Sequence, residues 1–206
     1  EMSIRGVLRG FGLKVGAVTP KSFEARVREL VADHPTLELV TQALLAARAV
    51  LAQEFCGLDR RIRAVARSDR KVRLLMSTPG VGAVVAPTYS AAIDDPGRFR
   101  SSKAAGAHFG LTPKKYQSGE TDFTGRISKL GDKEVRCALY EAAHVMLTRP
   151  TKGSKLKTWA LAVAKRAGMR KAKVALARRL AGVLHRMLAD GVAFNPDLGG
   201  PVAKAS

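Results

Sequence analysis

Apolar side chains recur at intervals of seven residues through the first third of the chain. The repeat consists of Leu37, Leu44, Leu51, Leu58, Val65 and Val72. Val40 and Ala47 occupy the companion positions early in the repeat, but Glu54, Arg61 and Ser68 occupy them later. A sustained heptad is typical of a coiled-coil seam, and the polar companions indicate a narrow one. The pattern fits both an intermolecular coiled coil and a long amphipathic helix folded into its own domain.

The heptad is preceded by a shorter predicted helix and by a glycine-rich start. Thr19 and Pro20 provide a helix cap and a first-turn proline, and His34-Pro35 predicts the end of that helix. We interpret residues 20–76 as a helical coiled-coil region. Residues 1–19 contain four glycines and are predicted to be a linker from an N-terminal domain that this chain lacks.

Glycine and proline separate shorter elements between residues 77 and 190, which predicts a compact domain. Asp132 is placed to cap a helix that runs to about Leu147, and two basic helices follow, divided near Gly168. An extended run over 114–127 predicts a short β-hairpin. Residues 191–206 carry no pattern and are predicted to be a disordered tail. The predicted fold is therefore mainly α, with long coiled-coil-like helices before a compact helical domain.

Charge adds a function class to this picture. The chain of 206 residues has 36 Lys and Arg against 17 Asp and Glu, a formal net charge of +19. Residues 142–189 contain twelve of the basic residues and no Asp or Glu. Such a run is costly without a nearby polyanion, so nucleic acid is the favoured partner. The alternatives are a basic segment that only aids solubility and, less favoured with one interfacial aromatic residue, a membrane surface.

Composition also excludes several classes. Two Cys and four His exclude a disulfide scaffold or a zinc finger. No uncharged apolar run reaches about 18 residues, which predicts no transmembrane helix and no membrane partner. The start, Glu1-Met2-Ser3, is not a signal peptide. We therefore expect a cytoplasmic protein and a fragment of a longer chain.

Two segments are candidates for phosphate chemistry. The first is Pro79-Gly80-Val81-Gly82 between apolar helices, which is similar to a helix-hairpin-helix element. The backbone N–H groups of Gly80 and Gly82 can approach a phosphate without a Cβ in the way. Such elements hold DNA backbones without reading sequence. The alternative is a tight corner between two helices that binds nothing.

The second segment is a Ser-Gly turn, Ser118-Gly119, flanked by the cations Lys114, Lys115, Arg126 and Lys129. An exposed serine among cations is a candidate nucleophile for a phosphodiester, because the cations stabilise charge that develops on the phosphoryl oxygens. Tyr116 either packs beside Ser118 or orients a phosphate. No general base is evident, and chemistry alone favours a simple turn.

Five motifs in order resemble those of one family. They are Pro79-Gly80-Val81-Gly82, Asp95-Pro96-Gly97-Arg98-Phe99-Arg100-Ser101, His108-Phe109-Gly110-Leu111-Thr112-Pro113, Tyr116-Gln117-Ser118-Gly119 and Gly125-Arg126-Ile127-Ser128-Lys129. The chain resembles the IS-one-ten-type (DEDD) transposases of bacterial insertion sequences, described as bridge-RNA-guided recombinases. The match is strongest over residues 78–147.

The resemblance implies an enzyme in which Ser118 attacks a DNA phosphodiester and forms a transient 5′-phosphoserine link. It also implies Mg²⁺ bound by four acidic residues of an N-terminal RuvC-like domain. The implied partners are donor and target DNA, a guide RNA, and further copies of the protein in a homodimer or higher homo-oligomer. The resemblance further implies a bacterial, nucleoid-associated protein. This chain lacks those acidic residues, so we expect no cofactor or metal ligands in it, and binding without cleavage by this chain alone. The alternative is a non-catalytic helix-hairpin-helix module that binds DNA or RNA.

The predicted site therefore has one nucleophile and a set of nucleic-acid contacts. The nucleophile is Ser118. The predicted contacts are Gly80, Gly82, Lys114, Lys115, Tyr116, Arg126, Lys129, Lys165, Arg166, Arg170, Lys171, Lys173, Arg178 and Arg179.

Overall fold

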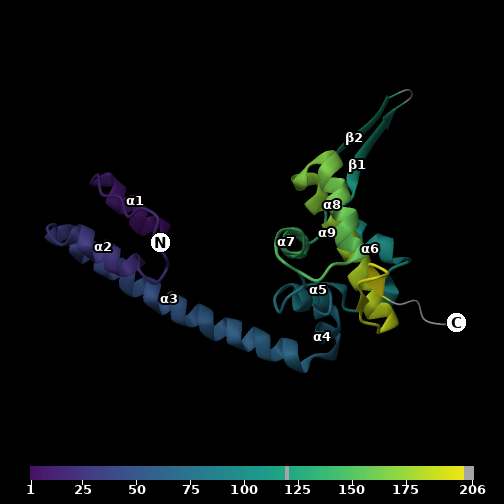
Figure 1. Cartoon of the computed structure of the whole chain (residues 1–206), viewed down its shortest axis with the longest axis horizontal. Helices are drawn as coiled ribbons and strands as arrows, with labels where there is room; N and C mark the ends of the chain where they lie inside the picture. The colour runs from purple at the N-terminus through teal and green to yellow at the C-terminus, as the bar shows by residue number, and fades with distance from the viewer. Residues whose placement is uncertain (119–120, 202–206) are drawn as a thin grey trace. The chain divides into compact units, whose positions relative to one another are not determined.

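The computed structural model describes residues 1–118 and 121–201, without the side chains of 116, 117 and 121–124. Within these residues it has nine α-helices, one 3₁₀ turn and two short two-stranded hairpins (Figure 1). The prediction of a mainly helical fold is confirmed. The chain divides into two compact units, Glu1–Arg61 and a second unit from Ile62 onward.

Unit 1 is built from α1 (Met2–Gly10), α2 (Phe23–Val31) and the first part of α3 (Pro35–Ser68). The Phe23 ring is fully buried, and the guanidinium groups of Arg5 and Arg48 lie 5.2 and 5.3 Å from its centre. Arg48 Nη2 also donates to Pro20 O at 2.9 Å. The core of unit 1 contains Ile4, Leu8, Val15, Phe23, Val27, Val31, Leu37 and Leu45.

Three boundaries in unit 1 differ from the sequence prediction. Residues 2–10 are helical and supply Ile4 and Leu8 to the core, so this part of the predicted linker is folded. These two residues are four apart and therefore share one helix face. The second helix begins at Phe23 rather than at Pro20, with Ser22 at its N-cap. The predicted end at His34-Pro35 is also displaced: α2 ends at Val31, and Pro35 is the first residue of α3.

The heptad on α3 has two different environments. Leu37 is buried in unit 1, whereas Leu51, Leu58 and Val65 are 69%, 57% and 58% exposed. Val72 lies in the next helix, α4 (Arg70–Met76), whose N-cap Asp69 accepts from Val72 N at 3.1 Å. The middle of the repeat therefore has no apolar partner among the described residues.

Length and composition alone would also allow α3 to cross a bilayer, the only such helix in the described ranges. The sequence prediction of no transmembrane helix considered only uncharged apolar runs. It did not include α3, because this helix contains charged residues such as Arg48. A single helix of this kind is weak evidence for a membrane span.

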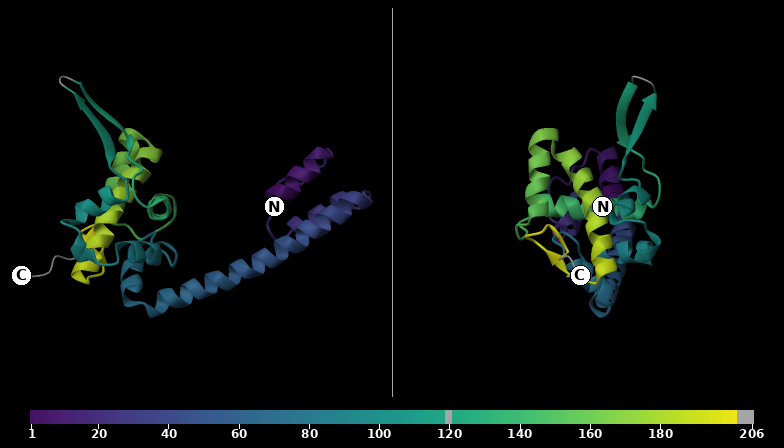
Figure 2. Two further views of the ribbon diagram at one scale, coloured as in Figure 1. Left: turned by 180° about the vertical axis from the view of Figure 1, so that it is seen from behind. Right: turned by 90° about the vertical axis from the view of Figure 1, so that its right-hand side faces the viewer.

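Unit 2 is organised around α9 (Met169–Asp190), which packs against α6 (Ser102–His108), α7 (Lys133–Thr148) and α8 (Lys155–Ala167) (Figures 1 and 2). The other helical elements are α5 (Val85–Ile93), which packs on α4 and α7, and η1 (Pro96–Arg98). Asp132 caps α7 as predicted, accepting from Glu134 N and Val135 N at 2.7 and 3.1 Å. The break between α8 and α9 lies at Gly168, as predicted.

A buried long-range hydrogen bond joins two helices in the core of unit 2. Tyr89 on α5 is fully buried, and its hydroxyl donates to Ala181 O on α9 at 2.6 Å. Burial raises the pKa of Tyr89, because the phenolate would lose its hydration. Tyr89 therefore remains a donor throughout the neutral range and ties α5 to α9.

Two hairpins complete unit 2. Strands β1 (Pro113–Ser118) and β2 (Thr121–Ile127) are antiparallel, as predicted for this segment, and extend away from the helices of the unit (Figures 1 and 2). Strands β3 (Phe194–Asn195) and β4 (Gly200–Pro201) pair antiparallel and β4 packs on α9. The described part of the predicted tail is thus folded, because Phe194 is buried and anchors it to the core. The remaining tail residues, 202–206, lie outside the described residues.

Candidate nucleic-acid interface

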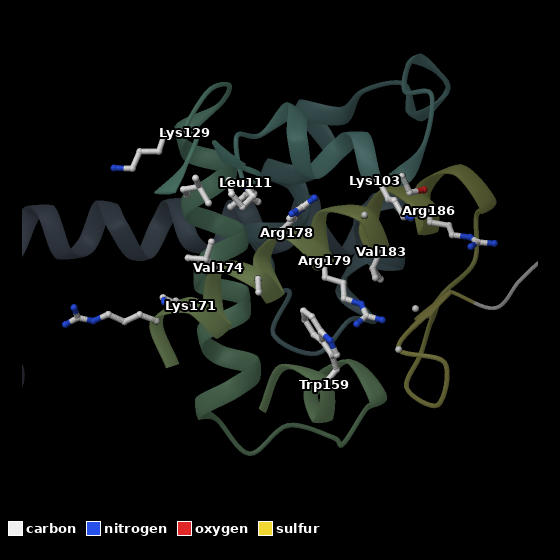
Figure 3. Close-up of a pocket in the computed structure, with 18 of the residues that line it drawn as sticks. Lys103, Leu111, Lys129, Trp159, Lys171, Val174, Arg178, Arg179, Val183 and Arg186 are labelled. Atoms are coloured by element: carbon white, nitrogen blue, oxygen red, sulfur yellow. The ribbon is translucent and has the colours of Figure 1, made fainter. Parts of the chain in front are cut away.

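A cavity of about 1480 Å³ runs along α9 in unit 2. Its walls come from α6, from the base of the β1–β2 hairpin, from α8 and from the β3–β4 segment (Figure 3). We call it the α9 groove. Its apolar lining consists mainly of Leu111, Ile127, Trp159, Val174, Val183 and Leu198.

The α9 groove is strongly basic. None of its described lining residues is acidic, whereas its eight cations are all exposed. Arg186 has an ion pair, at 3.2 Å to Asp190. Opposing walls of one sign concentrate the field inside a groove and attract a polyanion. The cations are Lys103, Arg126, Lys129, Arg170, Lys171, Arg178, Arg179 and Arg186.

An aromatic side chain lies among these cations. The Arg179 guanidinium carbon is 4.5 Å from the centre of the Trp159 ring, and both residues line the α9 groove (Figure 3). Trp159 is partly buried and packs against the core through α8. It is the only tryptophan in the chain. The groove therefore offers a flat surface as well as charge.

His185 fixes the wall of the groove that α6 provides. Its ring is 4% exposed, with Nε2 3.0 Å from Pro96 O and Nδ1 3.0 Å from Ser102 Oγ. A carbonyl oxygen only accepts, so Nε2 carries the proton and, in the neutral ring, the Ser102 hydroxyl donates to Nδ1. Close approach at Gly182, where a Cβ would lie 3.1 Å from Ser102 O, brings α6 onto α9. Lys103, the next residue on α6, is thereby placed at the groove.

Arg136 on α7 fixes the base of the β1–β2 hairpin. Its Nη1 donates to Phe109 O at 3.0 Å and lies 3.2 Å from Leu130 O. Lys129 N donates to Gly110 O at 3.0 Å, which joins the two ends of the hairpin segment. The hairpin base is therefore held by backbone contacts and one side chain from α7.

Ser118 is exposed at the last position of β1 and pairs with Thr121. It lies five residue steps along β1 from Pro113 at the groove, a path of about 17 Å at 3.4 Å per residue. Lys114 and Lys115 are exposed on the same strand. Gly119 and the Tyr116 side chain lie outside the described part of the hairpin.

Arg126 and Lys129 lie at the hairpin base and not around Ser118. Arg126 is five residues along β2 from Thr121, again about 17 Å. The sequence-predicted ring of cations is therefore divided between the strand of Ser118 and the α9 groove. These residues are close in sequence, which suggested one ring of cations. In the extended hairpin, however, Ser118 and the two base cations lie at opposite ends.

The two glycines of the predicted helix-hairpin-helix element have different surroundings. Gly80 has φ +85° and packs against α7, where a Cβ would lie 2.5 Å from Ala142 O and 3.2 Å from Met146 N. Gly82 is exposed, with open space where its Cβ would be. The need for glycine at position 80 therefore comes from helix packing, which matches the alternative of a tight corner between helices.

Of the other predicted contacts, Arg170, Lys171, Arg178 and Arg179 line the α9 groove with the hairpin-base cations. Lys165 and Arg166 are exposed on α8 outside it, and the Lys173 ammonium lies 5.8 Å from the centre of the Tyr140 ring. Sequence reasoning missed Lys103 and Ser102, which reach the groove only through the packing of α6 on α9. It gave Trp159 no contact role, although a single tryptophan within a basic run was a usable signal.

The Mg²⁺ implied by the family resemblance does not fit the described residues. Among them, no three His, Cys, Asp or Glu side chains are grouped closely enough to hold a metal ion. Asp95 instead accepts from Gly97 N at 2.8 Å within its turn.

Comparison with known proteins identifies relatives over most of the chain. The "Transposase IS116/IS110/IS902 family" matches residues 72–159. The transposase for insertion sequence element IS1111A of Coxiella burnetii is 28% identical over 190 residues, covering 90% of this chain and 52% of that protein. The putative transposase y4pF/y4sB of Sinorhizobium fredii is 28% identical over 200 residues, covering 93% and 51%.

A third relative is the pilin gene-inverting protein of Moraxella bovis, which is 33% identical over 79 residues, 38% of this chain and 24% of that protein. The chain spans about half the length of the two transposases. The matched region includes the turn at Gly80, the β1–β2 hairpin with Ser118, and Trp159. Residues 72–159 of the chain are thus similar to the IS116/IS110/IS902 family of transposases, and most of the chain is similar to transposases of insertion sequences.

Proposed function

We propose that the chain is the C-terminal part of an RNA-guided DNA transposase in which Ser118 is the nucleophile. The observation that carries this proposal is an exposed serine on a projecting hairpin whose base opens into a groove with eight cations. A hairpin places a hydroxyl away from the protein body, where a DNA backbone can reach it. The names of the relatives, two transposases and a gene-inverting protein, agree with strand breakage and rejoining.

In the proposed reaction the Ser118 Oγ attacks a DNA phosphorus. An Oγ–P bond forms as the P–O3′ bond breaks, the serine hydroxyl proton leaves, and the 3′ oxygen takes up a proton. A 3′ hydroxyl of another strand then attacks the phosphoserine and restores Ser118. Lys114 and Lys115 supply positive charge on the same strand for the phosphoryl oxygens.

Activation of Ser118 is not provided by the described residues, since a free hydroxyl is a poor nucleophile near neutral pH. We propose that the activating carboxylates and their metal belong to other parts of the full-length protein, and that this chain alone binds nucleic acid without cleaving it. The exposed cations of α8 outside the groove, Lys165 and Arg166, provide a second basic surface for the proposed guide RNA.

The test is the replacement Ser118→Ala in the full-length transposase, supplied with guide RNA and with donor and target DNA. We expect recombination and the covalent protein–DNA link to be lost, while DNA binding changes less than about 3-fold, because an exposed hydroxyl contributes little to affinity. Gel assays for the covalent link and for recombinant product measure both. Recombination by Ser118→Ala at the wild-type rate would show that another group is the nucleophile.

We also propose that the chain forms a homodimer through the exposed side of α3. Val50, Leu51, Phe55, Leu58 and Val65 are each more than half exposed. An apolar stripe of this length at heptad spacing is complementary to a second copy of itself, as in a two-fold interface. The predicted intermolecular coiled coil is thereby assigned to the middle of α3, and the intramolecular alternative to its start.

The double replacement Leu51→Glu and Leu58→Glu is expected to weaken dimerisation at least about 100-fold, since burying each leucine contributes about 1.5–3 kcal/mol. Sedimentation over a concentration series measures the dissociation constant. A matched control, Gln53→Glu with Arg60→Gln, lowers the net charge equally at exposed positions outside the stripe and should still dimerise. A wild-type protein that stays monomeric at every concentration would refute the dimer.

A further inference from the structure

We propose that the α9 groove holds a single strand of DNA, with a base stacked at the Trp159–Arg179 pair. This deepens the proposed function by naming the form of nucleic acid that the groove takes. It rests on the proposed function only for the identity of the strand as DNA, because the groove itself is defined by geometry and charge.

The lining of the groove distinguishes a single strand from a duplex. A duplex presents phosphates and sugars outward and keeps its base faces inside, so it is matched by charge alone. The α9 groove instead combines its cations with apolar side chains such as Leu111, Val174 and Val183 (Figure 3). Phosphates set against apolar groups would lose hydration without gaining a hydrogen-bond partner. A single strand offers phosphates to the cations of the groove and base faces to its apolar side chains.

The Trp159–Arg179 pair supplies the stacking surface. Bases stack on indole rings and on guanidinium planes, and each such contact tolerates any base. Arg179 is exposed and already lies 4.5 Å from the centre of the indole ring, which is held in place by α8. An incoming base can therefore stack on the guanidinium or replace it over the ring. Either event changes the surroundings of Trp159.

The hairpin links this groove to the proposed nucleophile. Pro113, Arg126 and Ile127 at the hairpin base line the groove, and Ser118 lies about 17 Å further along β1. About five stacked nucleotides cover that distance at 3.4 Å each. A DNA strand joined to Ser118 therefore reaches the hairpin base within a short single-stranded segment. Its phosphates then pass the hairpin-base cations into the groove that Trp159 and Arg179 also line.

The experiment uses the complete 206-residue chain and the fluorescence of its single tryptophan. The probes are oligo(dT), a blunt DNA duplex of equal length, oligo(U) and inorganic polyphosphate at 0.15 M salt. We expect saturable quenching with oligo(dT), at least 10-fold weaker binding of the duplex, and no quenching with polyphosphate. Quenching by polyphosphate equal to that by oligo(dT) would overturn base stacking, and tighter binding of oligo(U) would replace DNA by RNA as the occupant.

Variants test the assignment by anisotropy of labelled oligo(dT). Trp159→Leu is expected to weaken oligo(dT) binding about 10-fold, whereas Trp159→Phe retains a stacking ring and binds within about 3-fold of wild type. Arg179→Ala, an exposed change that spares the core, is expected to weaken binding, and Arg149→Ala at an exposed position outside the groove serves as its control. Wild-type affinity in both Trp159→Leu and Arg179→Ala would refute the proposal. Ser118→Ala should bind oligo(dT) normally, so failure of the nucleophile assignment remains distinguishable from failure of the groove.

Discussion

Replacing Gly80 with alanine is expected to lower the free energy of unfolding of unit 2 by about 2–5 kcal/mol. Two costs add at this position. The left-handed backbone, φ +85°, costs an alanine about 1–2 kcal/mol. The added Cβ would lie 2.5 Å from the Ala142 carbonyl oxygen, and overpacking against backbone costs about 1–3 kcal/mol more. The neighbouring atoms belong to α7 and have no flexible side chain to move aside.

Thermal unfolding followed by circular dichroism measures this loss, with a midpoint shift of roughly 5–15 °C expected. Gly82→Ala is the matched control two residues away, because its Cβ enters open space and its φ is not in the left-handed region. It should change the stability by less than about 0.5 kcal/mol. Equal effects of the two replacements would contradict a packing role for Gly80. A phosphate-binding role would instead lower affinity in Gly82→Ala while leaving the fold intact.

Neutralising three groove cations together, Lys171→Ala, Arg178→Ala and Arg179→Ala, is expected to weaken single-strand binding about 100-fold at 0.1 M salt. Each phosphate neutralised contributes about 0.7 to the slope of log affinity against log salt for a single strand. Loss of three contacts should therefore flatten the slope by about 2. All three side chains are exposed, so their removal leaves the core of unit 2 unchanged. Anisotropy titrations at four or five salt concentrations give the slope directly.

The control triple variant is Arg73→Ala, Arg149→Ala and Lys152→Ala, which removes the same charge from exposed positions of unit 2 outside the groove. Its slope should match that of the wild type, since charges beyond about 8 Å are largely screened at physiological salt. If the two triple variants lose affinity equally, the basic segment acts through net charge alone. The groove would then have no special role in binding.

The sequence was sufficient for elements whose signals are local. Asp132 caps α7, and the face of Val135, Leu139, Ala142 and Met146 is buried as its spacing predicts. The same holds for Leu180 and Leu184 in α9. Caps and helical stripes depend on residues within a few positions of each other, so the chain alone specifies them.

The α9 groove could not be predicted because it depends on contacts between distant segments. Lys103 reaches it through the packing of α6 on α9, where His185 bonds Ser102 and Pro96 across more than 80 positions of sequence. Glycine-rich composition also misled the assignment of the chain's start, where the pair Ile4 and Leu8 outweighs it. At the other end, one buried ring, Phe194, was enough to fold a segment without periodicity.

The attachment of the β1–β2 hairpin has a consequence for when Ser118 can react. Arg136 and the backbone near Gly110 hold only the hairpin base, and each strand packs chiefly on the other. Two strands without a third are marginally stable in water. The position of Ser118 is therefore expected to become fixed when a binding partner contacts the hairpin. For the proposed nucleophile this means that the geometry of attack depends on assembly of the complex and not on the hairpin alone.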